Sequence, residues 1–310
     1  MSLNVSGLAA YTDEQKMPLI KKSILEGRTI QYITVQPDIK STASINIMDS
    51  TLSLQAGSCG FTDAGSTSLT QRDLSVCPLK VNESICLDTL ESYYTQAMMQ
   101  PGSYNEDIPF EQLYAEDKAE KIAAAIEDNV WKGNSPDFTG QTACDGFLNV
   151  FENTAASGST VAGNSSSATA ITAANVIGLV DDVAAAIPTD IIDSDDLVLF
   201  MGYDTYRLWA TALRNANLFH YDGAENQGDN FSQMIPGTNI RVIAVRGLNG
   251  TDRMFASRAS NFYFGTDLLN DWENFSIFYS MDNQEVRFVA KFKIGVNVAF
   301  PGFVVAFKLA

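Results

Sequence analysis

The residue types that carry most enzyme and metal chemistry are scarce in this sequence. Histidine occurs once, at His220, between Phe219 and Tyr221. A histidine-dependent catalytic triad and a histidine-rich metal site are therefore nearly excluded, and we interpret His220 as a packing or edge residue. The motifs of phosphate loops, dinucleotide sites, hydrolase elbows and zinc proteases do not occur. We predict no catalytic residue, no cofactor and no enzyme activity.

Acidic side chains offer the remaining route to a site. Asp190, Asp193, Asp195 and Asp196 lie close together in the sequence and could bind a divalent cation. Because the segment lacks the glycine and the terminal glutamate of an EF-hand loop, we interpret it as a solvated turn before a buried strand and predict no metal site. Two carboxylates for glycoside hydrolysis can meet in space from anywhere in the chain. An acidic glycoside hydrolase therefore stays an alternative.

The charge balance bears on nucleic-acid binding. The 37 acidic and 20 basic residues give a net charge of −17, which argues against a surface that coats DNA or RNA. Arg287, Lys291 and Lys293 share one face of the last predicted strand and could contact nucleic acid. We favour the interpretation that these three residues lie on a solvated face or contact an acidic patch of a neighbouring subunit.

The cysteines and the hydropathy indicate a compartment. The four cysteines, Cys59, Cys77, Cys86 and Cys144, contain no C-x-x-C pair. The first residues lack the basic and apolar segments of a secretory signal, so we expect reduced, structural thiols in a cytosol. No run of about 18 apolar residues occurs, so no membrane-spanning helix is predicted.

One long helix, predicted over 109–132, is the element on which the others depend. Asp107 is a plausible N-cap and Pro109 falls in the first turn, while Gly133 and the following Asn134-Ser135-Pro136 end the helix. Apolar residues recur at three- and four-residue steps along one face. A helix of this size is about 36 Å long and can support the other parts of the chain.

The amino-terminal third has little core of its own. Residues 1–30 read as an extended arm with one short helix, and 30–35 as a strand. A long hairpin is predicted after them, with a small, polar tip at 56–68 and a return strand over 69–79. Because a thin hairpin is marginal alone, it needs a neighbour to lie on.

The rest of the chain predicts an α+β protein. We expect a helix over 84–100, a low-complexity loop over 153–170 and a helix over 172–187. A buried strand over 197–201 turns at Gly202 into a helix, and strands follow over 240–245 and 254–258. A hairpin then pairs 275–280 with the alternating strand 286–298, and a turn at Pro301-Gly302 leads into 303–307.

These elements and four stretches in fixed order resemble one known family. The stretches are Cys144-Asp145-Gly146-Phe147-Leu148, then residues 197–206, 235–240 and 261–268. Together they resemble the major capsid proteins of tailed bacteriophages, which have the Hong Kong 97-type fold. The resemblance implies an amino-terminal arm (1–30), an extended loop with its base strands (31–83), a peripheral domain with a spine helix (84–139), an axial domain (140–272) and returning peripheral strands (273–310).

The resemblance also implies a function. Such a chain is a structural protein whose copies form hexamers and pentamers of an icosahedral shell around phage double-stranded DNA, without sequence-specific binding or a membrane. It is assembled in the bacterial cytoplasm, ends up in the virion, and works with a scaffold protein, a portal and decoration proteins. Contacts between copies are expected in the arm and loop at Tyr11, Leu19, Ile20, Gln55, Phe61, Leu69 and Arg72. Because some relatives carry an acidic scaffolding segment before the arm, we expect either a separate scaffold protein or a segment that has already been lost. No Lys–Asn crosslink is predicted.

Two further readings stay open beside the glycoside hydrolase. An encapsulin-type nanocompartment shares the implied fold but encloses enzymes, and it would need a groove for cargo peptides. A β-rich tail or adhesin module is opposed by the long helix.

Overall fold

The computed structural model describes residues 28–57, 59–61, 63–86, 110–138, 144–152, 161–162, 169–216, 231–267, 276–283 and 285–309. The expected arm helix, the Asp107 cap and His220 lie outside these ranges. In the described part of the chain, no helix combines the length and the apolar character needed to cross a membrane.

The predicted long helix is α4, Phe110–Lys132. Its apolar stripe is buried near the carboxyl end, where Ile122, Ile126 and Val130 face the core, as the spacing predicts. Gly133 follows in tight contact with other backbone, and Asn134 takes the left-handed conformation (φ 48°) that ends the helix.

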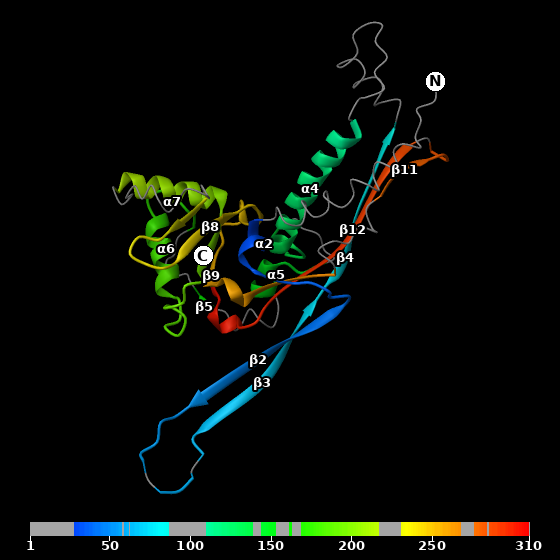
Figure 1. The fold of residues 1–310 in the computed structure, drawn as a ribbon. Helices are drawn as coiled ribbons and strands as arrows, with labels where there is room; N and C mark the ends of the chain where they lie inside the picture. The colour runs from blue at the N-terminus through cyan, green and yellow to red at the C-terminus, as the bar shows by residue number, and fades with distance from the viewer. Residues whose placement is uncertain are drawn as a thin grey trace.

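A five-stranded sheet runs beside α4 (Figure 1). Its strands are β1 (Thr34–Gln36), β4 (Cys77–Cys86), β10 (Phe262–Thr266), β11 (Ser276–Ser280) and β12 (Glu285–Val298). The long strand β12 pairs antiparallel with β4, β10 and β11. The predicted alternation of β12 is confirmed, because Phe288, Ala290 and Ile294 are buried while Lys291 on the opposite face is exposed.

A six-stranded sheet forms the second body. Its order is β5 (Val161–Ala162), β13 (Val305–Phe307), β9 (Met254–Arg258), β6 (Leu197–Gly202), β8 (Arg241–Val245) and β7 (Ser232–Met234). The strand β6 is buried throughout, as its continuous apolar run predicts.

The two faces of this sheet belong to two cores. Leu197, Leu199 and Met201 pack with α6 (Val176–Ala185) and α7 (Tyr203–Asn215). Val198 and Phe200 point the other way, toward α4, α5 (Phe147–Glu152) and the first sheet. Short 3₁₀ turns join the strands: η2 (Arg246–Leu248), η3 (Ala259–Asn261) and η5 (Pro301–Phe303).

Trp131, which the sequence reading did not single out, centres the first core. It is fully buried, and its ring centroid lies 5.2 Å from Phe147, 5.4 Å from Phe200 and 5.7 Å from Phe255. The turn η2 approaches closely because Gly247 has no side chain; a Cβ there would lie 2.3 Å from the Trp131 ring. Trp131 thus joins the long helix to the six-stranded sheet.

Three expectations about secondary structure are wrong in part. Residues 30–32, expected as the start of a strand, belong to the helix α2 (Arg28–Tyr32), and β1 begins only at Thr34. The chain is still a strand at 84–86, where a helix was expected, because β4 pairs with β12 as far as Cys86. Within the expected loop 153–170, Val161–Ala162 is a strand beside β13. The second and third differences arise because the segment pairs with a distant strand.

Candidate assembly surface

The predicted long hairpin is formed by β2 (Thr42–Leu52) and β3 (Gly65–Ser75). Their register pairs Thr42 with Ser75 and Leu52 with Gly65. The return strand, expected as one piece over 69–79, breaks at Val76, whose N–H donates to the Ser41 carbonyl. Figure 1 shows the hairpin reaching well beyond the two sheets.

Burial in the hairpin is confined to its root. Ile45, Ile47 and Leu74 pack with Ile39 and Val76 in a small core of their own. Beyond Ile47 every residue of β2 is exposed, as is every residue of β3 before Arg72. Among the described residues, nothing therefore gives the outer two thirds of the hairpin hydrophobic support.

The root is fixed by two paired glycines. Gly265 of β10 and Gly295 of β12 are register partners, so both present the same face to the hairpin. A Cβ on Gly295 would lie 2.1 Å from the Ser75 carbonyl oxygen, and one on Gly265 would lie 3.0 Å from the Leu74 side chain. Asn297 Nδ2 also donates to the Asp73 carbonyl at 2.7 Å. This close crossing sets the direction in which the hairpin leaves the body.

One face of the hairpin carries exposed apolar side chains. Met48 and Leu69 are register partners and are 67% and 78% exposed. Leu52 lies on the same face and is also exposed. Met48, Leu52 and Leu69 form what we call the hairpin patch. Apolar side chains clustered on a projecting element make the hairpin patch a candidate surface for a partner.

Polar pairs separate the hairpin patch from the root. On the same face, Gln71 Nε2 donates to Asn46 Oδ1 at 2.8 Å, and Ser44 Oγ donates to Asp73 Oδ1 at 3.1 Å. These bonds stiffen the hairpin without needing a partner. In the described part of the chain no third strand joins β2 or β3, so both outer edges present backbone groups as well.

The residues expected to contact other copies fall into three groups. Gln55, Phe61 and Leu69 are exposed on the outer hairpin, and Phe61 is 96% exposed. Arg72 is half-buried opposite Ile45, on the face away from Leu69, and partial burial lowers the pKa of its guanidinium. Tyr11, Leu19 and Ile20 lie outside the described residues. Whether any of the seven touches a neighbour stays a prediction.

The sequence reading missed Met48 and Leu52. The sequence does contain a signal for them. Met48 and Leu52 lie at even-numbered positions, so in a strand they face the side opposite to Ile45 and Ile47. This signal identifies an outward face only once the register with Leu69 is known.

A buried clasp holds the segment that leads out to the arm. Thr29 of α2 donates its backbone N–H (3.2 Å) and its hydroxyl to the Glu127 carboxylate of α4. The Thr29 hydroxyl also accepts from Trp131 Nε1 at 2.8 Å. Burial raises the pKa of Glu127, although the bonds from Thr29 and the charge of Arg28 act in the opposite direction. The position of α2 is thus tied to the end of the long helix.

The three basic residues of β12 do not form an open cationic surface. Lys293 Nζ bonds Asp267 at 2.8 Å and the Lys40 carbonyl at 3.0 Å. Arg287 lies 3.9 Å from Glu285. Lys291 is exposed between them.

The aspartate cluster belongs to a turn. Asp190, Asp193 and Asp195 are exposed there. Asp196 accepts from Arg258 Nε at 3.0 Å and Ser260 Oγ at 2.6 Å. Partial burial would raise the pKa of Asp196, but these bonds and the charge of Arg258 outweigh it and lower the pKa. Across the described residues no group of His, Cys, Asp or Glu is arranged to hold a metal.

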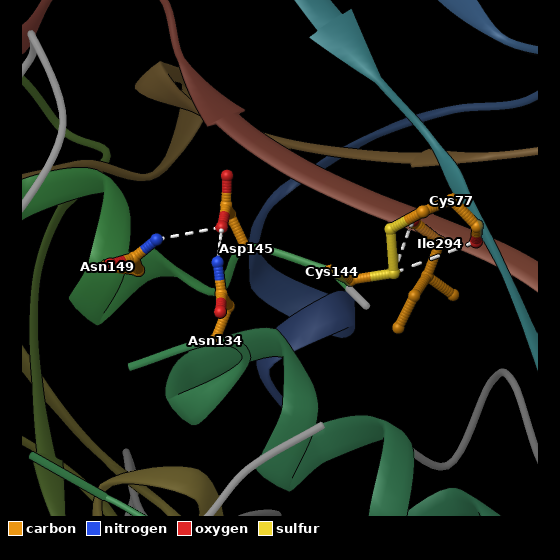
Figure 2. Close-up of a disulfide and its surroundings, with 6 residues drawn as sticks. All are labelled: Cys77, Asn134, Cys144, Asp145, Asn149 and Ile294. Carbon is orange, nitrogen blue, oxygen red and sulfur yellow. Dashed lines mark hydrogen bonds between the residues drawn. A yellow bond between two sulfur atoms is a disulfide. The ribbon is translucent and has the colours of Figure 1, made fainter. Parts of the chain in front are cut away.

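The structure shows two of the cysteines in the oxidised state, joined by a disulfide, rather than as the reduced thiols expected from the sequence. Cys77 and Cys144 are 67 residues apart in sequence, and their Cα atoms are 5.8 Å apart (Figure 2). Their spacing gave no sign of the bond because β4 and the segment after α4 meet only in the folded chain. Cys59 is free and exposed near the hairpin tip. The side chain of Cys86 is outside the described part.

Comparison with known proteins gives matches in structure alone. No family model and no curated protein sequence matches the chain. The satellite phage P4 procapsid, in a structure that includes the size determination protein, is matched at 12% identity over 96% of this chain and 98% of that one, with a TM-score of 0.57. The Gordonia phage Cozz structure is matched at 12% identity over 91% and 86%, with a TM-score of 0.59. A virus-like particle from Pyrococcus furiosus is matched at 12% over 95% and 98%, with a TM-score of 0.53.

These matches span nearly the whole of each chain, so they cover both sheets, the long helix and the projecting hairpin together. The identities are too low to carry more than the fold. The chain therefore has the Hong Kong 97-type fold of tailed-phage capsid proteins.

Proposed function

We propose that this chain is the major capsid protein of a tailed bacteriophage. Its copies form the hexamers and pentamers of an icosahedral shell that encloses double-stranded DNA without reading its sequence. The observation that carries the proposal is the match with a procapsid protein over 96% of this chain. The chain acts by shape, not by catalysis, and a glycoside hydrolase receives no support from the matches.

The hairpin supplies the physical reason for assembly. The hairpin patch and the tip residue Phe61 are exposed in the single chain. Covering a large apolar side chain contributes about 1.5–3 kcal/mol, so a second copy lying on this surface would stabilise a shell contact. Gln55, Phe61, Leu69 and Arg72 are the described residues that we propose as contacts. Tyr11, Leu19 and Ile20 are proposed for the arm.

We assign the parts of the chain to the parts of a capsid subunit. The arm is 1–30, the extended loop with its base strands is 31–83, and the peripheral domain with its spine helix is 84–139. The axial domain is 140–272, and 273–310 returns to the peripheral domain. The placement of α4 beside β4 and β12 and the separate core under α6 and α7 support this division. Two strands cross its bounds, because β10 belongs to the five-stranded sheet and β13 to the six-stranded sheet.

Further partners follow from the proposal. A separate scaffold protein would guide assembly in the bacterial cytoplasm, and a portal and decoration proteins would complete the virion. None of these is needed for the first test, which asks only whether copies of this chain assemble.

The test is negative-stain electron microscopy of the purified, tag-free chain beside light scattering after size exclusion. Closed shells, tubes or rings of subunits are the expected result. A monomer that never assembles, even when crowded or supplied with a scaffold, would overturn the proposal.

A variant with a shortened hairpin tests whether the hairpin is needed for assembly. Ile47 and Thr70 are register partners, so residues 48–69 can be replaced by a two-residue Asn-Gly turn that keeps the root. This variant is expected to keep the unfolding midpoint of the unassembled chain and to form no shells. Normal shells from the shortened chain would show that the hairpin is not the assembly surface.

A genome-free nanocompartment is the second candidate. The match with a virus-like particle from Pyrococcus furiosus favours a shell without stating its contents. Particles purified from the native source decide between the two: packaged DNA supports the phage capsid, and a packaged enzyme supports the nanocompartment.

A further inference from the structure

The two disulfide cysteines are positioned independently of the bond between them. Cys77 opens β4 and is the register partner of Ile294 at one end of a ladder of ten residue pairs. Its Sγ lies 3.6 Å from the Ile294 carbonyl oxygen, and the Sγ of Cys144 lies 3.7 Å from the same oxygen. The backbone bonds of the ladder hold Cys77 whether or not its sulfur is bonded.

Cys144 is held by a second set of contacts at the end of α4. Gly146 N–H donates to the Gly133 carbonyl at 2.8 Å. Asp145 Oδ1 accepts from Asn134 Nδ2 and from Asn149 Nδ2, both at 2.7 Å (Figure 2). A Cβ on Gly133 would lie 2.5 Å from the Cys144 carbonyl oxygen, so no bulkier residue fits this crossing.

Because each cysteine is fixed by its own contacts, the two thiols face each other before they react. The Cα separation of 5.8 Å is in the usual range for disulfides. Cys77 is half-buried, whereas Cys144 is only 2% exposed. A reagent in solution therefore reaches Cys77 first.

We propose that Cys77 and Cys144 form a reversible redox staple between the root of the hairpin and the end of the long helix. In a reducing cytosol the pair stays as two thiols. In oxidising surroundings the Cys77 thiolate attacks a small disulfide such as glutathione disulfide, forming a mixed disulfide and releasing one glutathione thiolate. The Cys144 thiolate then attacks the Cys77 sulfur and releases the second glutathione. The protein loses two protons and two electrons, and glutathione disulfide is reduced to two thiols.

The staple joins the strand that follows the hairpin root to the end of the long helix. The strand β4 continues from the hairpin root, and the segment 144–146 is packed on the end of α4. The timing of closure, after assembly in the cytosol and on release from the cell, rests on the proposed capsid function. The redox chemistry of Cys77 and Cys144 does not depend on that function.

The first measurement is the thiol state in producing cells. Cells are treated with N-ethylmaleimide before lysis, and Cys77 and Cys144 are examined by peptide mass spectrometry. Both are expected to carry the label. A disulfide already present inside the cells would overturn the switch.

The second measurement follows closure in vitro. Purified chain is treated with glutathione disulfide or with a phosphine reductant, and its melting temperature is recorded. Oxidation is expected to link the two cysteine peptides and to raise the Tm by about 5 °C or more. Thiols that stay free in glutathione disulfide, or a bond that forms without a rise in Tm, would overturn the staple.

Matched variants separate the staple from loss of folding. Cys59→Ala removes the exposed cysteine and is expected to keep the oxidation-dependent rise in Tm, whereas Cys77→Ala and Cys144→Ala are expected to lose it. Each variant is compared with itself in the two redox states, so a lower Tm caused by the substitution cancels. A working staple in a chain that never forms shells would count against the capsid proposal and leave the staple standing.

Discussion

At the scale of single residues, Glu127 is the buried carboxylate of the described chain, with 3% of its surface exposed. Burial raises its pKa above the ordinary value of 4.5. The folded chain therefore holds this proton more tightly than the unfolded chain does. Its contribution to stability is greatest below about pH 4.5 and is lost as the pH rises through the raised pKa of the folded state.

We expect Glu127→Gln to remove this part of the pH dependence, because the amide keeps an acceptor for Thr29 without a charge. Urea unfolding between pH 5 and pH 8 is the measurement, and the variant's free energy of unfolding should vary less with pH than that of the wild type. Glu127→Ala is the control. It leaves the Thr29 donors without an acceptor and should cost about 1–3 kcal/mol. Equal slopes for wild type and Glu127→Gln would contradict the assignment.

Gly295 provides a second residue-scale prediction. Gly295→Ala pushes the Ser75 backbone away from the sheet and should lower the free energy of unfolding by about 1–3 kcal/mol, as overpacking does. Gly57→Ala is the matched control at the hairpin tip, where a Cβ meets nothing within 4 Å. It should stay within about 0.5 kcal/mol of the wild type. If the two variants unfold alike, the glycine crossing does not hold the hairpin root.

At the scale of elements, the two faces of the hairpin should respond differently to mutation. Leu69→Ser changes an exposed residue of the hairpin patch and is expected to leave unfolding within about 0.5 kcal/mol while reducing the yield of shells. Thr70→Ser, on the opposite face, should leave both unchanged. Ile45→Ser, in the root, should destabilise the unassembled chain by about 2–5 kcal/mol.

Unfolding is followed on unassembled chain and shell yield by sedimentation, so that stability and assembly are measured separately. Full shell yield from Leu69→Ser together with Met48→Ser would show that the hairpin patch faces solvent in the shell.

At the scale of the whole molecule, the net charge of −17 sets an expectation for the genome. DNA-free shells of this chain should not retain free duplex DNA at physiological salt, because the described basic residues of β12 are largely engaged with acidic partners and carbonyls. Co-sedimentation with labelled duplex is the measurement, with a basic DNA-binding protein as the positive control. Duplex that pellets with the shells would contradict this expectation.

The six-stranded sheet lies between two hydrophobic cores, one on each of its faces. The alternating side chains of β6 contribute to both, and Trp131 joins the long helix to that sheet. The hairpin stands outside both cores, and its stability beyond the root depends on what covers it.

Local patterns determined much of this architecture from the sequence alone. Periodicity and breaking residues predicted the carboxyl end and the buried stripe of α4, the apolar run of β6, the turn at Gly202 into α7 and the alternation of β12. Such signals act over a few residues, so no partner is needed to read them. The exposed Phe61 and Leu69 were likewise identified from a hairpin that lacks a core.

Tertiary structure alone decided the features that depend on distant partners. Residues 30–32 were predicted to begin a strand, but they belong to a helix that Glu127 and Trp131 hold through Thr29. The strand β4 reaches Cys86 because β12 lies beside it, and Cys77 meets Cys144 because the ladder and the glycine crossing bring them together. Met48 joins Leu69 only through the register of the hairpin. Register and packing are set by contacts between segments far apart in the chain, and no local pattern encodes them.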